Sequence, residues 1–155
     1  MGKSCCVTGR RRLPVSQIKR IKEEHRREIE FVIKDGYAHF ISGMAEGVDL
    51  YFAGIITEIK VQNSDITLEA AIPRRKRLDA KDSAFQRLIK LCDTVHVTLE
   101  TFNGGVYMNR NMYMVGKCER IIAVYDGRDS GGTAFTIRYA RTREREINII
   151  TLEQE

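Results

Sequence analysis

Residues 121–140, IIAVYDGRDSGGTAFTIRYA, hold the pattern that decides the fold. The apolar run 121–125 is followed by a polar turn and then by Ser130-Gly131-Gly132-Thr133, where helical spacing begins. A short apolar run bounded by turn residues is typical of a buried strand, and glycines let the backbone approach a ligand closely. The first amides of the following helix have no partner within it and lie at the positive end of its dipole. This junction therefore predicts a seat for a phosphate group.

The rest of the chain repeats this order of strand, turn and helix. Hydrophobic patterning predicts strands at 4–8, 38–42, 66–72, 94–98, 121–125 and 147–152, and helices at 16–34, 48–61, 83–92, 106–117 and 133–144. Ser16 is the expected N-cap of the first helix, and Gly36 is expected to end it. Strict alternation with short connections predicts right-handed crossovers and a parallel sheet covered on both faces. We expect one domain over 1–155, a Rossmann-like three-layer α/β sandwich with a mainly parallel sheet.

The composition is that of a globular protein, with 43% hydrophobic and 30% charged residues. The apolar runs are too short to cross a bilayer, and residues 1–6 lack the apolar region of a signal peptide. We therefore expect a cytosolic protein. The four cysteines have no metal or redox spacing, and His25, His39 and His96 are scattered, so we expect no metal and no cofactor. His25 falls on the apolar stripe of the first helix and is expected to be packed.

Glycines, hydroxyls and arginines gather at the carboxyl ends of the predicted strands. In open parallel sheets, ligands bind beyond those ends. The net charge is +5, and two basic clusters, 10–12 and 74–77, each follow a strand. Either cluster alone is also explained as a solvated loop, but their shared placement favours an anionic ligand. The predicted ligand-binding residues are Thr8, Gly9, Arg10, Arg11, Ser42, Gly43, Met44, Glu46, Asp49, Pro73, Arg75, Asn109, Arg110, Tyr113, Asp126, Ser130, Gly131, Gly132 and Thr133.

These candidates have different expected roles. The amides of residues 131–133 and the Thr133 hydroxyl would hold a phosphate, although a plain tight turn explains the same glycines. Arg10 and Arg11 would add a second anion contact, and residues 42–44 would line the pocket by close backbone approach. Asn109 and Tyr113 share a helix face that fits either a base or ribose, or a subunit contact.

Glu46 and Asp49 have two interpretations. Carboxylates at the start of a helix stabilise its dipole, typically by ~0.3–1 kcal/mol, which is a sufficient structural reason for them. They also fit a hydrogen bond to ribose hydroxyls, or a catalytic role at a ribosyl centre. The sequence leaves these readings open.

Several linked motifs resemble the SLOG superfamily. They are residues 6–11 (CVTGRR), 41–49 (ISGMAEGVD), 71–73 (AIP), 110–115 (RNMYMV) and 123–127 (AVYDG), followed by Gly131-Gly132-Thr133. The superfamily includes DNA-processing A proteins, Lonely Guy enzymes and ligand-sensing domains of some anti-phage systems. The motifs are most similar to its YpsA-like branch of small bacterial and phage proteins. The resemblance covers nearly the whole chain and implies a Rossmann-like fold, a nucleotide-type ligand, and a role in ligand sensing or in phage defence or anti-defence.

The chain also departs from that pattern. Arg10 stands where the branch usually has histidine, Gly116 where it has aspartate, and Arg74 where it has cysteine, and the chain contains no tryptophan. Lonely Guy enzymes carry a catalytic glutamate shortly after the matching threonine, where this chain has Phe135 and Thr136. These changes remove candidate acid–base groups while keeping the glycine junction.

Three functions remain as hypotheses. The favoured one is capture of a phosphorylated nucleoside-type molecule, such as an ADP-ribose or NAD-derived signal, without turnover. The first alternative is an N-glycosidic nucleotide hydrolase that uses Glu46 or Asp49 as its catalytic residue. Single-stranded nucleic-acid binding is the least favoured, because the aromatic residues fall largely within apolar stripes rather than along a basic groove. Nucleic acid is therefore expected to be an unlikely partner.

A homo-oligomer is the expected assembly. Residues 48–61 carry apolar side chains almost all round the predicted helix, more than one buried stripe requires. Tyr107, Met108 and Met112 add apolar surface on the helix at 106–117. We expect a dimer or larger assembly built on these two helices, with the ligand edge near the seam.

Overall fold

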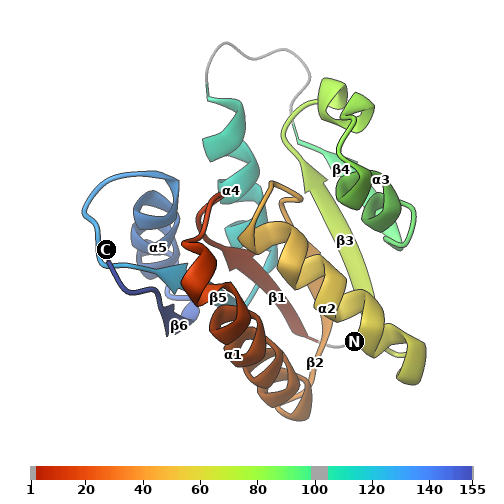
Figure 1. The fold of residues 1–155 in the computed structure, drawn as a ribbon, viewed down its shortest axis with the longest axis horizontal. Helices are drawn as coiled ribbons and strands as arrows, with labels where there is room; N and C mark the ends of the chain where they lie inside the picture. The colour runs from red at the N-terminus through yellow and green to blue at the C-terminus, as the bar shows by residue number, and fades with distance from the viewer. Residues whose placement is uncertain (1–2, 99–104, 155) are drawn as a thin grey trace.

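A computed structural model describes residues 3–98 and 105–154. Within them, six strands form one sheet of order β4-β3-β2-β1-β5-β6, and every neighbouring pair is parallel. The strands are β1 Lys3–Thr8, β2 Tyr37–Ser42, β3 Thr67–Ile72, β4 Thr94–Val97, β5 Arg120–Tyr125 and β6 Glu146–Thr151. The helices are α1 Val15–Lys34, α2 Val48–Gln62, α3 Ser83–Ile89, α4 Val106–Lys117 and α5 Gly132–Thr142, with a 3₁₀ turn η1 at Arg75–Asp79. The predicted Rossmann-like α/β fold is confirmed (Figure 1).

The order of the strands fixes where a ligand can enter. The chain moves outward from β1 through β2 and β3 to β4, and then crosses back to add β5 and β6 on the other side of β1. Helices α1 and α2 consequently cover one face of the sheet, and α4 and α5 cover the other (Figure 1). The loops that leave β1 and β5 diverge to opposite faces, which opens a crevice at the carboxyl ends of these two strands.

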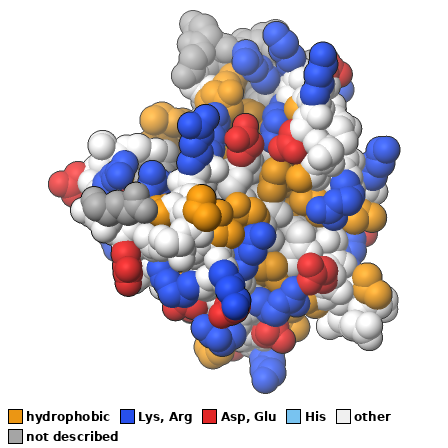
Figure 2. Space-filling view, viewed as in Figure 1, with side chains coloured by type: hydrophobic (Ala, Val, Ile, Leu, Met, Phe, Trp, Pro, Cys, Tyr) orange, Lys and Arg blue, Asp and Glu red, His pale blue; other side chains and the backbone are white. Residues whose placement is uncertain are grey.

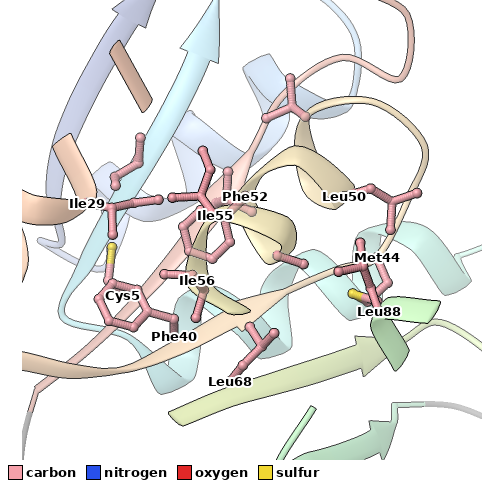
Figure 3. Packing of buried hydrophobic residues seen from close by; sticks show 14 of the residues in the cluster. Cys5, Ile29, Phe40, Met44, Leu50, Phe52, Ile55, Ile56, Leu68 and Leu88 are labelled. Atoms are coloured by element: carbon pink, nitrogen blue, oxygen red, sulfur yellow. The ribbon is translucent and has the colours of Figure 1, made fainter. Parts of the chain in front are cut away.

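The larger core lies between the sheet and helices α1, α2 and α3. Phe40 of β2, Leu68 of β3, and Phe52 and Ile56 of α2 are fully buried there (Figure 3). His25 of α1 is also fully buried, with its ring 5.3 Å from that of Phe52. This confirms that His25 is a packed residue.

A smaller core lies under α4 and α5. It contains Cys6, Ile41, Val115, Cys118 and Ile121. Cys5 packs in the larger core, and Cys92 is partly buried against it. Burial raises the pKa of the Cys5 and Cys118 thiols well above the ordinary value, so these cysteines act as small apolar residues.

Three local predictions were wrong. Helix α1 begins one residue early, with Pro14 at the N-cap position, and Ser16 lies inside the first turn. Pro14 provides no side-chain cap, and its carbonyl accepts from the Gln17 amide at 2.9 Å. The helix expected to reach residue 92 ends at Ile89, and η1 was not expected because Arg75–Asp79 carries no apolar period.

Most apolar side chains of α2 are buried against other elements of the same chain. This helix contacts α1 on one side, α3 on the other and three strands beneath it. Leu50 and Ile55 are only 7% exposed, while Phe52 and Ile56 are fully buried; Val61 at the end of the helix stays exposed. The reason for expecting a subunit contact on α2 was therefore wrong, because a helix flanked by two others buries more than one stripe. No helix in the described part of the chain is long and apolar enough to cross a membrane.

Candidate functional site

A pocket of about 370 Å³ opens at the crevice between the ends of β1 and β5. Residues of the β1 end, of the loop before α2, of α4 and of the start of α5 line it. They are Val7, Thr8, Gly9, Arg10, Arg11, Ala45, Asp49, Tyr107, Met108, Arg110, Asn111, Gly132 and Thr133. We call this hollow the β1–β5 pocket. The fold thus brings Arg10 and Arg11 of the first basic cluster, and Gly132 and Thr133 of the glycine junction, to the wall of one pocket.

A second hollow of about 230 Å³ adjoins the first. Its lining residues are Arg11, Gly43, Ala45, Glu46, Pro73, Arg74, Lys76, Arg77, Tyr107 and Arg110. We call it the η1 pocket, because the 3₁₀ turn supplies its basic wall. Arg11, Ala45, Tyr107 and Arg110 line both pockets and form the boundary between them. Figure 2 shows Lys and Arg side chains spread over this face of the molecule, including its upper part, towards which β3 points in Figure 1.

Arg110 is the most deeply held cation of the site. Its side chain projects from α4 and is only 5% exposed, yet it lines both pockets. Its Nη1 donates to the Gly43 carbonyl at 2.6 Å, and its Nε donates to Asn111 Oδ1 at 2.9 Å. Burial lowers its pKa, an effect that the neighbouring Asp49 carboxylate opposes. A guanidinium retains its charge even so, and Arg110 still has donors beyond these two bonds.

Arg77 is held in a similar way by the next residue of the same loop. Its Nη2 donates to the Met44 carbonyl at 2.5 Å, and its guanidinium lies 4.1 Å from the centre of the Phe85 ring. Met44 has φ +57, a conformation uncommon for a residue with a side chain. This turn of the backbone directs the Gly43 and Met44 carbonyls to two different arginines.

Tyr107 supplies an exposed aromatic ring between the two pockets. The ring is 44% exposed, the Arg11 guanidinium lies 4.9 Å from its centre, and that of Arg110 lies 6.0 Å away. An aromatic face flanked by arginines is a surface on which a nucleobase can stack. The sequence indicated an exposed Tyr107, but we assigned it to a subunit contact.

The α5 junction is open. An added Cβ would meet no atom within 4 Å at either Gly131 or Gly132, and Gly131 has φ +100. Gly132 and Thr133 line the β1–β5 pocket, where the start of α5 carries no side-chain cap. Its first amides and dipole are therefore available to an anion.

The α2 junction is closed by the chain itself. Gly47 has φ +81, and an added Cβ there would lie 2.2 Å from the Arg11 carbonyl oxygen. The Val48 amide donates to the Arg10 carbonyl at 3.2 Å, and Asp49 Oδ2 accepts from the Ala45 amide at 3.2 Å. Ser42 Oγ donates to the Asp49 carbonyl and accepts from the Met44 amide. These groups hold the loop, so this junction is not a second phosphate cradle.

Several predicted residues lie away from the pocket walls. Ser42 and Met44 are fully buried behind the loop that they shape. Asp126 forms ion pairs with Arg10 at 3.8 Å and with Arg128 at 2.8 Å. Tyr113 donates to Glu69 Oε2 at 2.5 Å and stacks on His96. The remaining predicted residues that line neither pocket are Arg75, Asn109, Ser130 and Gly131. Residues 99 and 100, which directly follow the predicted strand at 94–98, lie outside the described residues.

Sequence reasoning missed part of the site. Arg74, Lys76 and Arg77 form the basic wall of the η1 pocket, although only Arg75 of this cluster was chosen. Ala45, Met108 and Asn111 also line the pockets. The basic run at 74–77 signalled the wall, but its turn geometry was needed to select which side chains face the hollow.

The described residues thus define an open parallel α/β protein with a pocket lined by arginines at its topological switch point. The model of the YspA SLOG family (YpsA) matches residues 12–154. The chain belongs to this family. A UPF0398 protein of Halalkalibacterium halodurans is 22% identical over 141 residues, which cover 84% of this chain and 75% of that protein.

Two solved structures share the fold. The X-ray structure of the structural-genomics target TM1055 has a TM-score of 0.60 and 19% identity, over 94% of this chain and 72% of that one. DNA processing protein A from Helicobacter pylori, described for its single-stranded DNA binding mode, has a TM-score of 0.65 and 17% identity. That match covers 96% of this chain but only 65% of the Helicobacter protein.

The prediction that nucleic acid is an unlikely partner was wrong. A protein of the same fold binds single-stranded DNA, so the fold gives no ground for this exclusion. Its sequence basis was incomplete, because Tyr107, which we assigned to a subunit contact, lies beside two arginines of the pockets. The periodicity of α4 could not reveal that this ring faces the site.

Proposed function

We propose that the chain binds a phosphorylated nucleoside-type molecule in the β1–β5 pocket, as a sensor or sequestering protein without turnover. One observation carries this proposal: the open start of α5 and the buried Arg110 guanidinium line the same hollow. A phosphate there would accept from the first amides of α5 and from the Thr133 hydroxyl, with arginines on the opposite side. ADP-ribose and other NAD-derived nucleotides belong to this class of ligand.

The ring of Tyr107 is the proposed stacking surface for the base. It lines the pocket beside Arg11 and is exposed. The aromatic residues of the larger core, in contrast, are buried and cannot contact a ligand. Stacking on an aromatic ring is worth about 1–3 kcal/mol per base. The ring therefore adds affinity without selecting among bases.

The environments of Glu46 and Asp49 support binding rather than turnover. Burial raises the pKa of Asp49, and its carboxylate is committed to the Ala45 amide while facing Arg110. Glu46 is exposed at the rim of the η1 pocket. A hydrolase of the alternative type needs one carboxylate free to stabilise a developing ribosyl cation; Asp49 is already bonded to the loop and Glu46 is exposed to solvent, so both environments favour binding over turnover.

Calorimetric titration with a panel of nucleotides tests the proposal. Thr133→Val should weaken binding about tenfold, because it removes a hydroxyl from the phosphate seat. Tyr107→Ala should weaken it by a similar factor, whereas Tyr107→Phe keeps the ring and should bind like the wild type. Ligand released by heating after stoichiometric binding should be chemically unchanged. Altered ligand would contradict the claim of no turnover, and unchanged affinity in both Thr133→Val and Tyr107→Ala would contradict the site.

Single-stranded nucleic acid is a second candidate ligand, and the exposed Tyr107 between two arginines favours it. The nucleic-acid binding of the Helicobacter protein supports the same candidate. Titration of a labelled mixed-sequence oligonucleotide at several salt concentrations distinguishes the two ligands. Strand binding predicts a steep loss of affinity with salt, by a log–log slope of about −0.7 per phosphate contacted. A mononucleotide site predicts a shallow slope and full competition by the free nucleotide.

A further inference from the structure

The η1 pocket has the composition of an anion site in its own right. Five of its ten lining residues are Lys or Arg, and Glu46 is the one acidic residue among them. Arg74 and Lys76 are exposed, and neither forms an ion pair with a carboxylate within residues 3–98 and 105–154. Asp49, behind Gly43, is a second carboxylate close to Arg11, Arg77 and Arg110. Five cations against these two carboxylates still leave a positive potential that attracts a phosphate.

Two further arginines of this pocket are fixed before any ligand arrives. Arg110 and Arg77 are anchored by the successive carbonyls of Gly43 and Met44. A guanidinium has five N–H donors, and the Met44 carbonyl takes one of those on Arg77. Donors that are already oriented lose less conformational entropy when a ligand binds. The pocket is thus a preorganised cationic surface as well as a charged one.

The η1 pocket is separate from the phosphate seat on α5. Its basic wall follows β3, whereas the seat follows β5, and the sheet places β2 and β1 between these strands. The ends of β3 and β5 are three inter-strand spacings apart, about 14 Å, but Arg77 reaches back to the Met44 carbonyl after β2, which is two spacings, or about 9 Å, from β5. Two phosphates separated by one nucleoside can span this shorter gap, because each lies about 3 Å from its donors. The boundary residues Arg11, Tyr107 and Arg110 lie between the two ends. Two phosphates joined by one bridging oxygen are too close together to use both.

We propose that the η1 pocket is a second phosphate subsite, so that the ligand is a nucleotide with two separated phosphates, such as a 5′-phosphorylated dinucleotide. This inference rests on the proposed function. One phosphate binds at the start of α5, the other binds at Arg74, Lys76 and Arg77, and a base stacks on Tyr107 between them. The basic turn after β3 is the feature that sets this specificity.

Calorimetry with matched ligands tests the second subsite. The probes are the four nucleoside 5′-monophosphates, ADP, the dinucleoside monophosphates NpN and their 5′-phosphorylated forms pNpN. For at least one base, pNpN should bind about ten- to a hundredfold more tightly than either the monophosphate or NpN, as an added charge-assisted contact requires. ADP, with adjacent phosphates, should show no comparable gain.

The variant Arg74→Ala/Lys76→Ala assigns that gain to the η1 pocket. Both side chains are exposed, so the variant should fold, and it should lose the advantage of pNpN while binding monophosphates as the wild type does. Lys81→Ala/Lys90→Ala removes the same charge from exposed positions outside both pockets and should keep the advantage.

The outcomes separate the two proposals. If no monophosphate binds, the proposed function itself fails. If monophosphates bind but pNpN gains nothing over NpN, only the second subsite is contradicted. An equal loss of monophosphate and pNpN binding in Arg74→Ala/Lys76→Ala would also contradict it, because the two pockets would then be one anion site.

Discussion

The two strand-to-helix glycine junctions look alike in sequence and differ in the structure. The α2 junction, residues 42–49, is filled by the chain: Gly47 meets the carbonyls of Arg10 and Arg11, and Asp49 holds the Ala45 amide. The α5 junction, residues 130–133, faces open space at both glycines and borders the β1–β5 pocket. Glycine permits close approach in both places, but in one the approaching group is the protein's own backbone.

This difference separates two uses of the same motif. A closed junction orients side chains: it holds the Gly43 and Met44 carbonyls in place, and these anchor Arg110 and Arg77. An open junction offers its amides to a ligand. The α2 junction should therefore be sensitive in stability, and the α5 junction should be sensitive in binding.

The largest expected effect is a difference in unfolding free energy between two alanine variants, one in each junction. Gly47→Ala should cost about 3 kcal/mol or more of unfolding free energy, because its φ is +81 and its Cβ would clash with backbone. Gly132→Ala should stay within about 1 kcal/mol of wild type, since its Cβ would meet no neighbour. Urea unfolding measures both. Equal losses would show that the junctions do not differ.

The buried His25, which packs on Phe52 of α2, should make the free energy of unfolding fall in acid. Burial lowers the pKa of His25 to about 3, against about 6.5 in an unfolded chain. The neutral His25 makes its full contribution to the free energy of unfolding above about pH 6.5. This contribution declines as the pH falls towards about 3, because the unfolded state then binds a proton that the folded state does not. Between pH 6.5 and 4.5 the unfolding free energy should fall by about 2–3 kcal/mol. His25→Leu should flatten this interval, and an unchanged pH profile in that variant would contradict the assignment.

A smaller effect should follow removal of one hydrogen-bonding group from the closed junction. Ser42→Ala loses the bonds to the Asp49 carbonyl and the Met44 amide, and should cost about 1–3 kcal/mol. Because this serine shapes the loop that anchors two arginines, its variant should also bind nucleotide more weakly. Thermal unfolding and calorimetry on the same samples measure the two effects. Lost binding with wild-type stability would place Ser42 in direct contact with the ligand instead.

Much of the fold was predictable from sequence because its signals are local. Strand and helix periods, short connections and right-handed crossovers lead to a parallel sheet, and they place the ends of β1 and β5 at one edge. The turn η1, which has no apolar period, and a few element ends were missed.

The site was less predictable because it depends on contacts between distant residues. The sequence of residues 42–49 could not show that the Arg10 and Arg11 carbonyls would fill the α2 junction. Nor could it show that α4 would turn Tyr107 towards two arginines while Tyr113 bonds to Glu69. Pocket residues such as Arg77 and Arg110 were identifiable as basic, but their carbonyl anchors required the tertiary structure.

The measurement that tests the central claim most directly is nucleotide affinity in Gly132→Asp. A carboxylate at the first position of α5 complements the helix dipole, so stability should be unchanged or rise by about 0.3–1 kcal/mol. The same carboxylate occupies the proposed phosphate seat and should abolish binding. Gly116→Asp, at an exposed glycine outside both pockets with no atom within 4 Å of an added Cβ, is the matched control and should bind normally. Wild-type affinity in a stable Gly132→Asp protein would contradict the claim that the open α5 junction holds the phosphate.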